Sequence, residues 1–178
     1  MSGELKLRRL SVETLEDFLD YFDHRAFLND PNWEGCYCQF YLNTGTEENS
    51  DNRELACQRV ETGKMDGYLA YLDDKVVAWC AAANSLLFPT LPDADDQLAR
   101  ILCFNVDPDF RGQTIAGKML DLVIEDLKHR GFDAIEAGPN SEGYGDKSYR
   151  GSLSMFLKRG FEVVTELGDG FVLVRKDI

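Results

Sequence analysis

The 178-residue sequence lacks the features that mark membrane, secreted and nucleic-acid-binding proteins. It has no apolar run near the ~20 residues that a membrane-spanning helix needs. Its first ten residues lack the apolar stretch of a secretory signal, which favours a cytoplasmic location. It has no excess of positive charge, because 19 Lys and Arg stand against 32 Asp and Glu, a net charge of −13. Nucleic-acid phosphates require a basic surface, so we expect no nucleic-acid partner. Because a long apolar run is lacking, we expect no membrane partner either.

Histidine and cysteine are also too few and too scattered to indicate a recognised metal site. The chain has 2 histidines, and its 5 cysteines are an odd number in a chain long enough to form a core without disulfides. We therefore expect reduced thiols and no metal. The acidity is compatible with a cationic substrate drawn to the protein, or with a role in solubility alone.

Hydrophobic periodicity predicts helices and strands in the order β-α-α-β-β-β-α-β-α-β-β. The clearest helix spans 113–130, where one apolar stripe ends in a basic turn followed by Gly131. Strands are expected at 5–12, 97–108, 132–138, 161–167 and 170–176, with a hairpin across 67–85 and further helices at 14–24, 51–61 and 148–159. This order indicates one α/β domain over 1–178, with a mixed and at least partly antiparallel sheet.

The segment from Val106 to Leu120, VDPDFRGQTIAGKML, carries the strongest functional signal. A strand stops at a proline, and an Arg-Gly loop leads directly into a helix. The first turn of a helix has free N–H groups and the positive end of the dipole, so this junction predicts an anion site. Gly112 allows close approach of the backbone, and Arg111 and Lys118 add positive charge.

Other interpretations of this segment are weaker. Gly112 to Lys118 reads G-x-x-x-x-G-K, but Met119 stands where a P-loop needs a hydroxyl for magnesium, and the remaining chain is too short for such a domain. An amphipathic helix after an ordinary glycine turn is the plainest alternative.

Residues 111 to 116 resemble the cofactor signature of the GNAT N-acetyltransferase superfamily, Arg/Gln-x-x-Gly-x-Gly/Ala. The resemblance extends upstream to Asn105–Pro108, which is similar to the end of the family's fourth strand. Downstream, MFLKRGF (Met155–Phe161) resembles the family's closing helix and turn. The resemblance covers at least Tyr68 to Val174, and the predicted element order also agrees with the family fold.

The resemblance implies acetyl-CoA as co-substrate, bound where two central strands splay apart. Residues 1–64 would then form the acceptor side and 65–178 the cofactor-binding core. Backbone groups of Phe104 and Val106 would pair with the pantetheine arm, and the loop would hold the pyrophosphate. The expected cofactor-binding residues are Phe104, Asn105, Val106, Arg111, Gly112, Gln113, Thr114, Ile115, Ala116, Gly117 and Lys118.

Two residues depart from the family pattern. Thr114 replaces the first glycine of the signature and crowds the backbone where the pyrophosphate would approach. Phe156 stands where many members have a tyrosine that protonates the departing thiolate, and phenylalanine cannot donate a proton. A catalytically silent module that binds or senses acyl-CoA is therefore the alternative to an enzyme.

The expected reaction is acetyl transfer to a primary amine on a small or peptidic, cationic acceptor, and it requires a base and an acid. Glu136, Glu34 and Asp96 are candidate bases, with Glu136 preferred. Tyr149 and Tyr144 are the nearest tyrosines to the Phe156 helix and are the candidate acids. The sequence leaves a homodimer open.

Residues 31–43, PNWEGCYCQFYLN, place two thiols among aromatic residues. They resemble a Trp-x-x-Cys-aromatic-Cys segment of a poorly characterised GNAT subgroup. The thiols can serve packing, as small apolar groups, or the segment can form a wall of the acceptor pocket. A metal or redox site is the third interpretation. The expected acceptor-side residues are Trp33, Glu34, Cys36, Tyr37 and Cys38.

Overall fold

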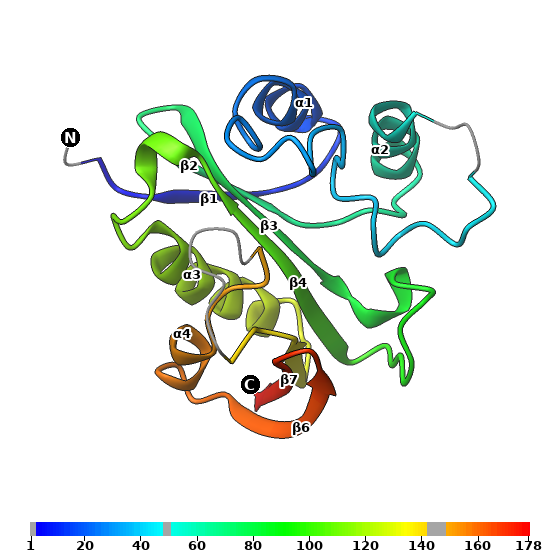
Figure 1. Cartoon of the computed structure of the whole chain (residues 1–178), viewed down its shortest axis with the longest axis vertical. Helices are drawn as coiled ribbons and strands as arrows, with labels where there is room; N and C mark the ends of the chain where they lie inside the picture. The colour runs from blue at the N-terminus through cyan, green and yellow to red at the C-terminus, as the bar shows by residue number, and fades with distance from the viewer. Residues whose placement is uncertain (1–2, 48–50, 142–148) are drawn as a thin grey trace.

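The computed structural model describes residues 3–47, 51–141 and 149–178. Within them, seven strands form one sheet in the order β1-β2-β3-β4-β5-β7-β6 (Figure 1). All neighbouring strands are antiparallel except β4 and β5, which are parallel. The strands are β1 (Lys6–Arg9), β2 (Tyr68–Leu72), β3 (Lys75–Asn84), β4 (Leu98–Val106), β5 (Ala134–Ala137), β6 (Glu162–Gly168) and β7 (Phe171–Asp177).

Helices cover both faces of the sheet (Figure 1). One face packs against α1 (Leu15–His24) and α2 (Asn52–Glu61), with Trp79 fully buried between them and the sheet. The other face packs against α3 (Ile115–His129) and α4 (Leu153–Leu157). Each face of the sheet therefore has its own apolar core. No helix among the described residues is both long and apolar enough to cross a membrane.

The predicted mixed α/β fold and the order of its elements are confirmed, and two elements have half of their expected length or less. The first strand occupies only Lys6–Arg9 of the predicted 5–12. The last helix occupies Leu153–Leu157 of the predicted 148–159, because Gly151 has a left-handed backbone (φ +78°) and the Ser152 side chain caps the helix immediately after it. The backbone before Leu153 is therefore a connecting segment.

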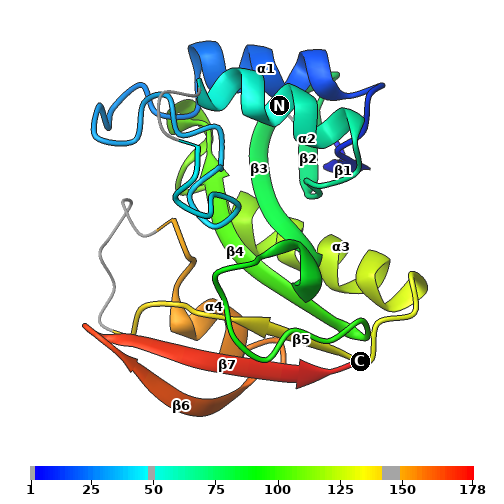
Figure 2. The same ribbon diagram turned by 90° about the vertical axis from the view of Figure 1, so that its right-hand side faces the viewer.

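The two halves of the sheet diverge at β4, as the splayed central strands of the predicted fold require. Strand β4 pairs with β5 only from Leu98 to Ile101. Leu102 is then an extra residue opposite β3, since Ile101 pairs with Ala82 and Cys103 with Ala81. Such a bulge bends and twists a strand. Figure 2 shows β2–β4 rising away from β5, β7 and β6 beyond this point.

Asn105 fastens α1 to β4 from inside the protein. Its side-chain Oδ1 accepts a 2.7 Å hydrogen bond from the Tyr21 hydroxyl, and its Nδ2 donates to the Ala26 carbonyl at 2.8 Å. Both Asn105 and Tyr21 are buried, and burial raises the pKa of Tyr21 well above its usual value. Removing one partner would leave a buried polar group without its hydrogen bond.

We expect Asn105→Ala to lower the free energy of unfolding by about 2–3 kcal/mol, because it strands both the Tyr21 hydroxyl and the Ala26 carbonyl. Tyr21→Phe should cost about 1 kcal/mol, less than Asn105→Ala, since it leaves only one buried acceptor, Asn105 Oδ1, without its donor. Urea denaturation of both single variants and the double variant measures the coupling. Losses that simply add would show that the two side chains do not act together.

Candidate functional site

The loop before α3 and the first turn of α3 line an open cavity. Asp107 starts a short turn by accepting a hydrogen bond from the Asp109 N–H at 3.0 Å, and Gly112 follows with φ +74°. Helix α3 has no side-chain cap at its N-terminus. Its first-turn N–H groups and the positive end of its dipole therefore face a position suited to an anion.

The cavity at this loop, the loop cavity, has a volume of about 520 Å³. Eight of the eleven expected cofactor-binding residues contribute to its lining. Gln113 and Lys118 are exposed outside the lining, and the Asn105 side chain points to α1 on the opposite face. The lining residues are Phe104, Val106, Phe110, Arg111, Gly112, Thr114, Ile115, Ala116, Gly117, Tyr149, Gly151, Ser152, Ser154, Met155, Lys158 and Arg159.

Two cations of the loop cavity, Lys158 and Arg159, follow α4 and were not expected from the sequence. Arg159 reaches α3, where it donates to the Gly117 carbonyl at 2.8 Å and pairs with Asp121 at 2.6 Å. A Cβ on Gly117 would lie 2.9 Å from the Arg159 guanidinium, so glycine provides the room for this contact. The sequence separation of 42 between Gly117 and Arg159 explains why local sequence patterns gave no sign of this contact.

Backbone groups of β4 beyond the bulge already have partners in this structure. The Phe104 N–H donates a 2.6 Å hydrogen bond to the Tyr149 carbonyl, and the Arg111 Nε donates to the Val106 carbonyl at 3.1 Å. The segment at Tyr149 therefore lies beside β4 in the gap that β5 leaves. Pairing of Phe104 and Val106 with a pantetheine arm stays a prediction. It requires the pantetheine to replace the Tyr149 carbonyl and the Arg111 side chain as hydrogen-bond partners.

Tyr149 lies at the boundary of the loop cavity and a second cavity, because it lines both. Its hydroxyl donates a 2.9 Å hydrogen bond to the buried carboxylate of Asp30. Burial, and then this hydrogen bond, raise the pKa of Tyr149 to about 12. The tyrosine is thus protonated at neutral pH, as a proton donor must be. Asp30 was not among the candidates from the sequence.

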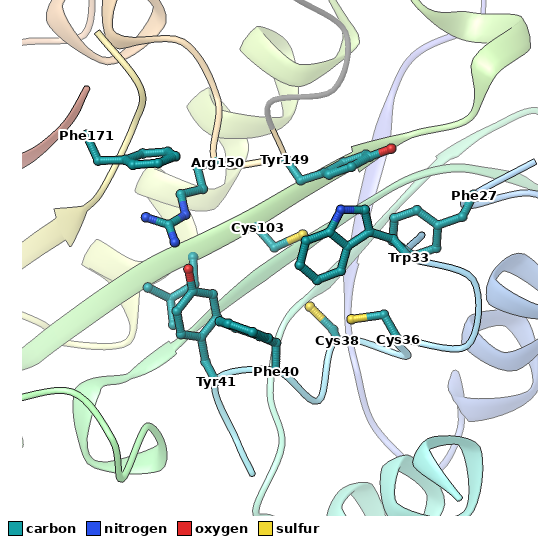
Figure 3. Close-up of a pocket in the computed structure, with 11 residues that line it drawn as sticks. Phe27, Trp33, Cys36, Cys38, Phe40, Tyr41, Cys103, Tyr149, Arg150 and Phe171 are labelled. Atoms are coloured by element: carbon teal, nitrogen blue, oxygen red, sulfur yellow. The ribbon is translucent and has the colours of Figure 1, made fainter. Parts of the chain in front are cut away.

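The second cavity, the aromatic-thiol cavity, has a volume of about 390 Å³ and lies against the segment 27–42 (Figure 3). This segment forms consecutive turns in which the N–H of every third residue from Asp30 to Leu42 bonds to the carbonyl three residues before it. The turns bring Trp33, Cys36 and Cys38 to one wall. The lining residues are Phe27, Trp33, Cys36, Cys38, Phe40, Tyr41, Leu102, Cys103, Tyr149, Arg150 and Phe171.

The pKa values of two thiols in this cavity, Cys36 and Cys38, are shifted in opposite directions. Burial raises the pKa of Cys36 to about 11. A hydrogen bond from the Cys103 thiol lowers the pKa of Cys38 in spite of its burial. All five cysteines are free thiols. Within 3–47, 51–141 and 149–178, no three His, Cys, Asp or Glu side chains are grouped so that they could hold a metal ion.

Other candidate residues lie away from Tyr149. The Tyr37 hydroxyl donates to Asp23, its ring stacks on Phe22 at 5.7 Å, and it is absent from the cavity lining. Glu34 is exposed and also outside this lining. Tyr144 falls outside the described residues.

The two remaining candidate bases, Glu136 and Asp96, belong to other surroundings. Glu136 pairs with Arg100 at 3.5 Å and Arg175 at 3.3 Å, in a third cavity of about 260 Å³ that adjoins the aromatic-thiol cavity. Asp96 is exposed, and its backbone carbonyl accepts from Asn84. Asp30 is therefore the carboxylate that directly contacts Tyr149.

A model of the acetyltransferase (GNAT) family matches residues 18–161, which is most of the chain. The chain belongs to the acetyltransferase (GNAT) family.

Solved structures support the same fold for this GNAT protein. It is similar to the GNAT domain of S. lividans PAT, with a TM-score of 0.63, 16% identity, and coverage of 99% of this chain and 92% of that one. PaiA N-acetyltransferase of Thermoplasma acidophilum, in complex with coenzyme A, matches with a TM-score of 0.58 and 15% identity, over 98% of this chain and 99% of that one. The ribosomal-protein-S18-alanine N-acetyltransferase of Escherichia coli matches with a TM-score of 0.58 and 14% identity, over 98% of this chain and 94% of that one. No sequence relative was found among curated proteins.

The two departures from the GNAT pattern have different structural consequences. Phe156 is fully buried in the core, where its ring packs on Phe161 and Phe104, so its position contributes no polar group to either cavity. Thr114, which replaces a glycine of the signature, has φ +61°. A β-branched residue is strained in this left-handed region, at a cost of roughly 1–2 kcal/mol.

We expect Thr114→Gly to raise the free energy of unfolding by about 1 kcal/mol, because glycine adopts positive φ without the steric cost. Gly112→Ala is the matched control, since Gly112 has φ +74° with open space around it, and it should destabilise the protein by about 1 kcal/mol. Chemical denaturation measures both. Equal stability of Thr114→Gly and the parent would show that the loop carries no strain at this residue.

Proposed function

We propose that this GNAT protein transfers an acetyl group from acetyl-CoA to the nitrogen of a primary amine. The observation that carries the proposal is the position of Tyr149, which is shared by a cavity suited to a phosphate-bearing cofactor and a cavity with an apolar wall. In the loop cavity, Gly112 leaves open space and the uncapped α3 terminus offers N–H donors to a pyrophosphate. Arg111 and Lys158 supply positive charge there, whereas the charge of Arg159 is paired with Asp121.

The acceptor must react as a neutral amine. An alkylamine with a pKa near ~10.4 is neutral in only about one molecule in 2,500 at pH 7, equivalent to about 4.6 kcal/mol. A carboxylate that accepts a proton during the reaction therefore assists the attack. Asp30 is proposed for this role because it directly contacts Tyr149. It is buried and lines neither cavity, so the proton reaches it through one water.

The proposed reaction forms an N–C bond and breaks the C–S bond of the thioester. Asp30 accepts, through that water, one proton from the attacking nitrogen, and Tyr149 donates its proton to the departing thiolate. The proton on Asp30 then passes along their 2.9 Å hydrogen bond and restores the tyrosine hydroxyl. In this proposal Tyr149 replaces the hydroxyl that Phe156 lacks.

The acceptor side of the proposal rests on the segment 27–42. Trp33, Cys36 and Cys38 line the aromatic-thiol cavity, which favours a role in acceptor binding for the Trp-x-x-Cys-aromatic-Cys segment over packing alone. Membership of the subgroup that shares this segment is part of the proposal, as are a single domain over 1–178, a cytoplasmic location and the homodimer.

Acetyl-CoA should bind saturably to the purified protein in a calorimetric titration. Gly112→Asp should weaken this binding at least about tenfold, because it places a carboxylate beside the proposed pyrophosphate position. Lys128→Ala is the matched control, since Lys128 is exposed in the last turn of α3, and its loss should change the affinity less than about twofold. Absence of binding to the parent protein at millimolar acetyl-CoA would refute the cofactor assignment.

Tyr149→Phe should lower kcat about 100-fold or more while leaving the affinity for acetyl-CoA nearly unchanged, because it removes only the proton donor. Asp30→Asn should have a comparable effect through loss of the base. Release of free CoA thiol over a panel of primary amines measures turnover. Tight binding of acetyl-CoA without turnover of any amine would instead identify a silent binding module.

A further inference from the structure

Arg150 introduces a positive charge into a cavity whose lining is otherwise mostly aromatic, aliphatic and thiol. Its side chain lies between two rings (Figure 3), with the guanidinium carbon 4.1 Å from the Phe171 ring centroid and 5.7 Å from that of Tyr41. It lines both the aromatic-thiol cavity and the neighbouring cavity that contains Glu136. The residue is half-buried.

The structure pairs other arginines of this region with carboxylates, but not Arg150. Arg100 and Arg175 hold Glu136 between them, and within the described parts of the chain no carboxylate forms an ion pair with Arg150. The rings stabilise the cation from its faces, but they accept none of its in-plane N–H groups. A guanidinium fork in apolar surroundings is suited to a carboxylate, which it binds through two parallel hydrogen bonds.

Arg150 also directly follows Tyr149 in the chain. Both residues line the aromatic-thiol cavity, so one molecule bound in that cavity can contact both. A reacting amine near the Tyr149–Asp30 pair and an acid group at Arg150 would belong to the same acceptor. The space between them is bounded by Trp33, Phe40 and the thiols, which favours an apolar group on that acceptor.

We propose that the acceptor is an amine that carries a carboxylate and a large apolar group, such as an α-amino acid with an aromatic or aliphatic side chain, and that Arg150 binds the carboxylate. This inference rests on the proposed function, of which it specifies the acceptor. The ammonium group of such a molecule is the cation expected from the net charge of −13. The molecule as a whole is a zwitterion.

The test compares L-phenylalanine and L-leucine with their amides and with the corresponding decarboxylated amines. Trp33 lines the cavity and is partly exposed, whereas Trp79 is fully buried, so tryptophan emission reports binding without any turnover. Trp33→Phe identifies the source of the signal. CoA release from acetyl-CoA gives KM for the same probes.

The parent protein should bind at least one of the two amino acids about tenfold or more tightly than its amide and its decarboxylated amine. Arg150→Gln should reduce this ratio to near one, mainly by weakening the amino acid. Arg150→Lys should keep part of the preference, because it keeps the charge and loses the fork. Arg8→Gln is the matched control, since Arg8 also lies over a tyrosine ring, that of Tyr71, and its loss should leave the ratio unchanged.

Three binding results would overturn the assignment. They are equal affinity of the parent for acid and amide, an unchanged preference in folded Arg150→Gln protein, and binding of none of the probes. Faster turnover of octanoyl-CoA than acetyl-CoA, without a carboxylate preference, would assign the cavity to the acyl chain and overturn it too. A carboxylate preference in emission without any CoA release would refute the proposed transfer reaction and leave the Arg150 site standing.

Discussion

The loss of pairing between β4 and β5 is the constraint on which the rest of the site depends. The bulge at Leu102 turns β4 away after Ile101, so the following backbone groups of β4 cannot bond to β5. A buried N–H without a partner costs about 1–3 kcal/mol, and the Tyr149 carbonyl supplies the partner at Phe104. The same divergence separates the loop cavity from the aromatic-thiol cavity and leaves Tyr149 between them.

Tyr149 consequently combines a structural and a proposed chemical role. Its carbonyl completes the edge of β4, while its hydroxyl is fixed by Asp30. A pantetheine amide that occupied the gap would take over the Phe104 N–H, exchanging one hydrogen bond for another at small net cost. Cofactor entry and the position of the tyrosine are then linked through a single backbone contact, and this link holds whichever amine is the acceptor.

The sequence predicted those parts of the fold and site that depend on neighbouring residues. Helix α3 follows from one apolar stripe, and its loop from a proline, an arginine and a glycine in succession. Asp30 was missed because its partner, Tyr149, lies 119 residues away. Arg159 was missed for the same reason. Glu136 was selected as a base from its position after α3, but the sequence could not indicate that two arginines surround it.

The positive φ of Thr114 shows that the loop keeps a left-handed backbone at residue 114 although threonine replaces the glycine of the cofactor signature. The backbone at this position is left-handed, as the family glycine would allow, although threonine is strained there. The rest of the loop therefore determines the conformation: Gly112 and Asp107 shape the turn, and the Arg111 Nε bonds to Val106. Strain of this kind persists only where surrounding contacts fix the backbone, and here they keep the α3 N-terminus facing the cavity. The anion site thus depends on the conformation of the whole loop, and a glycine at residue 114 is not required to produce it.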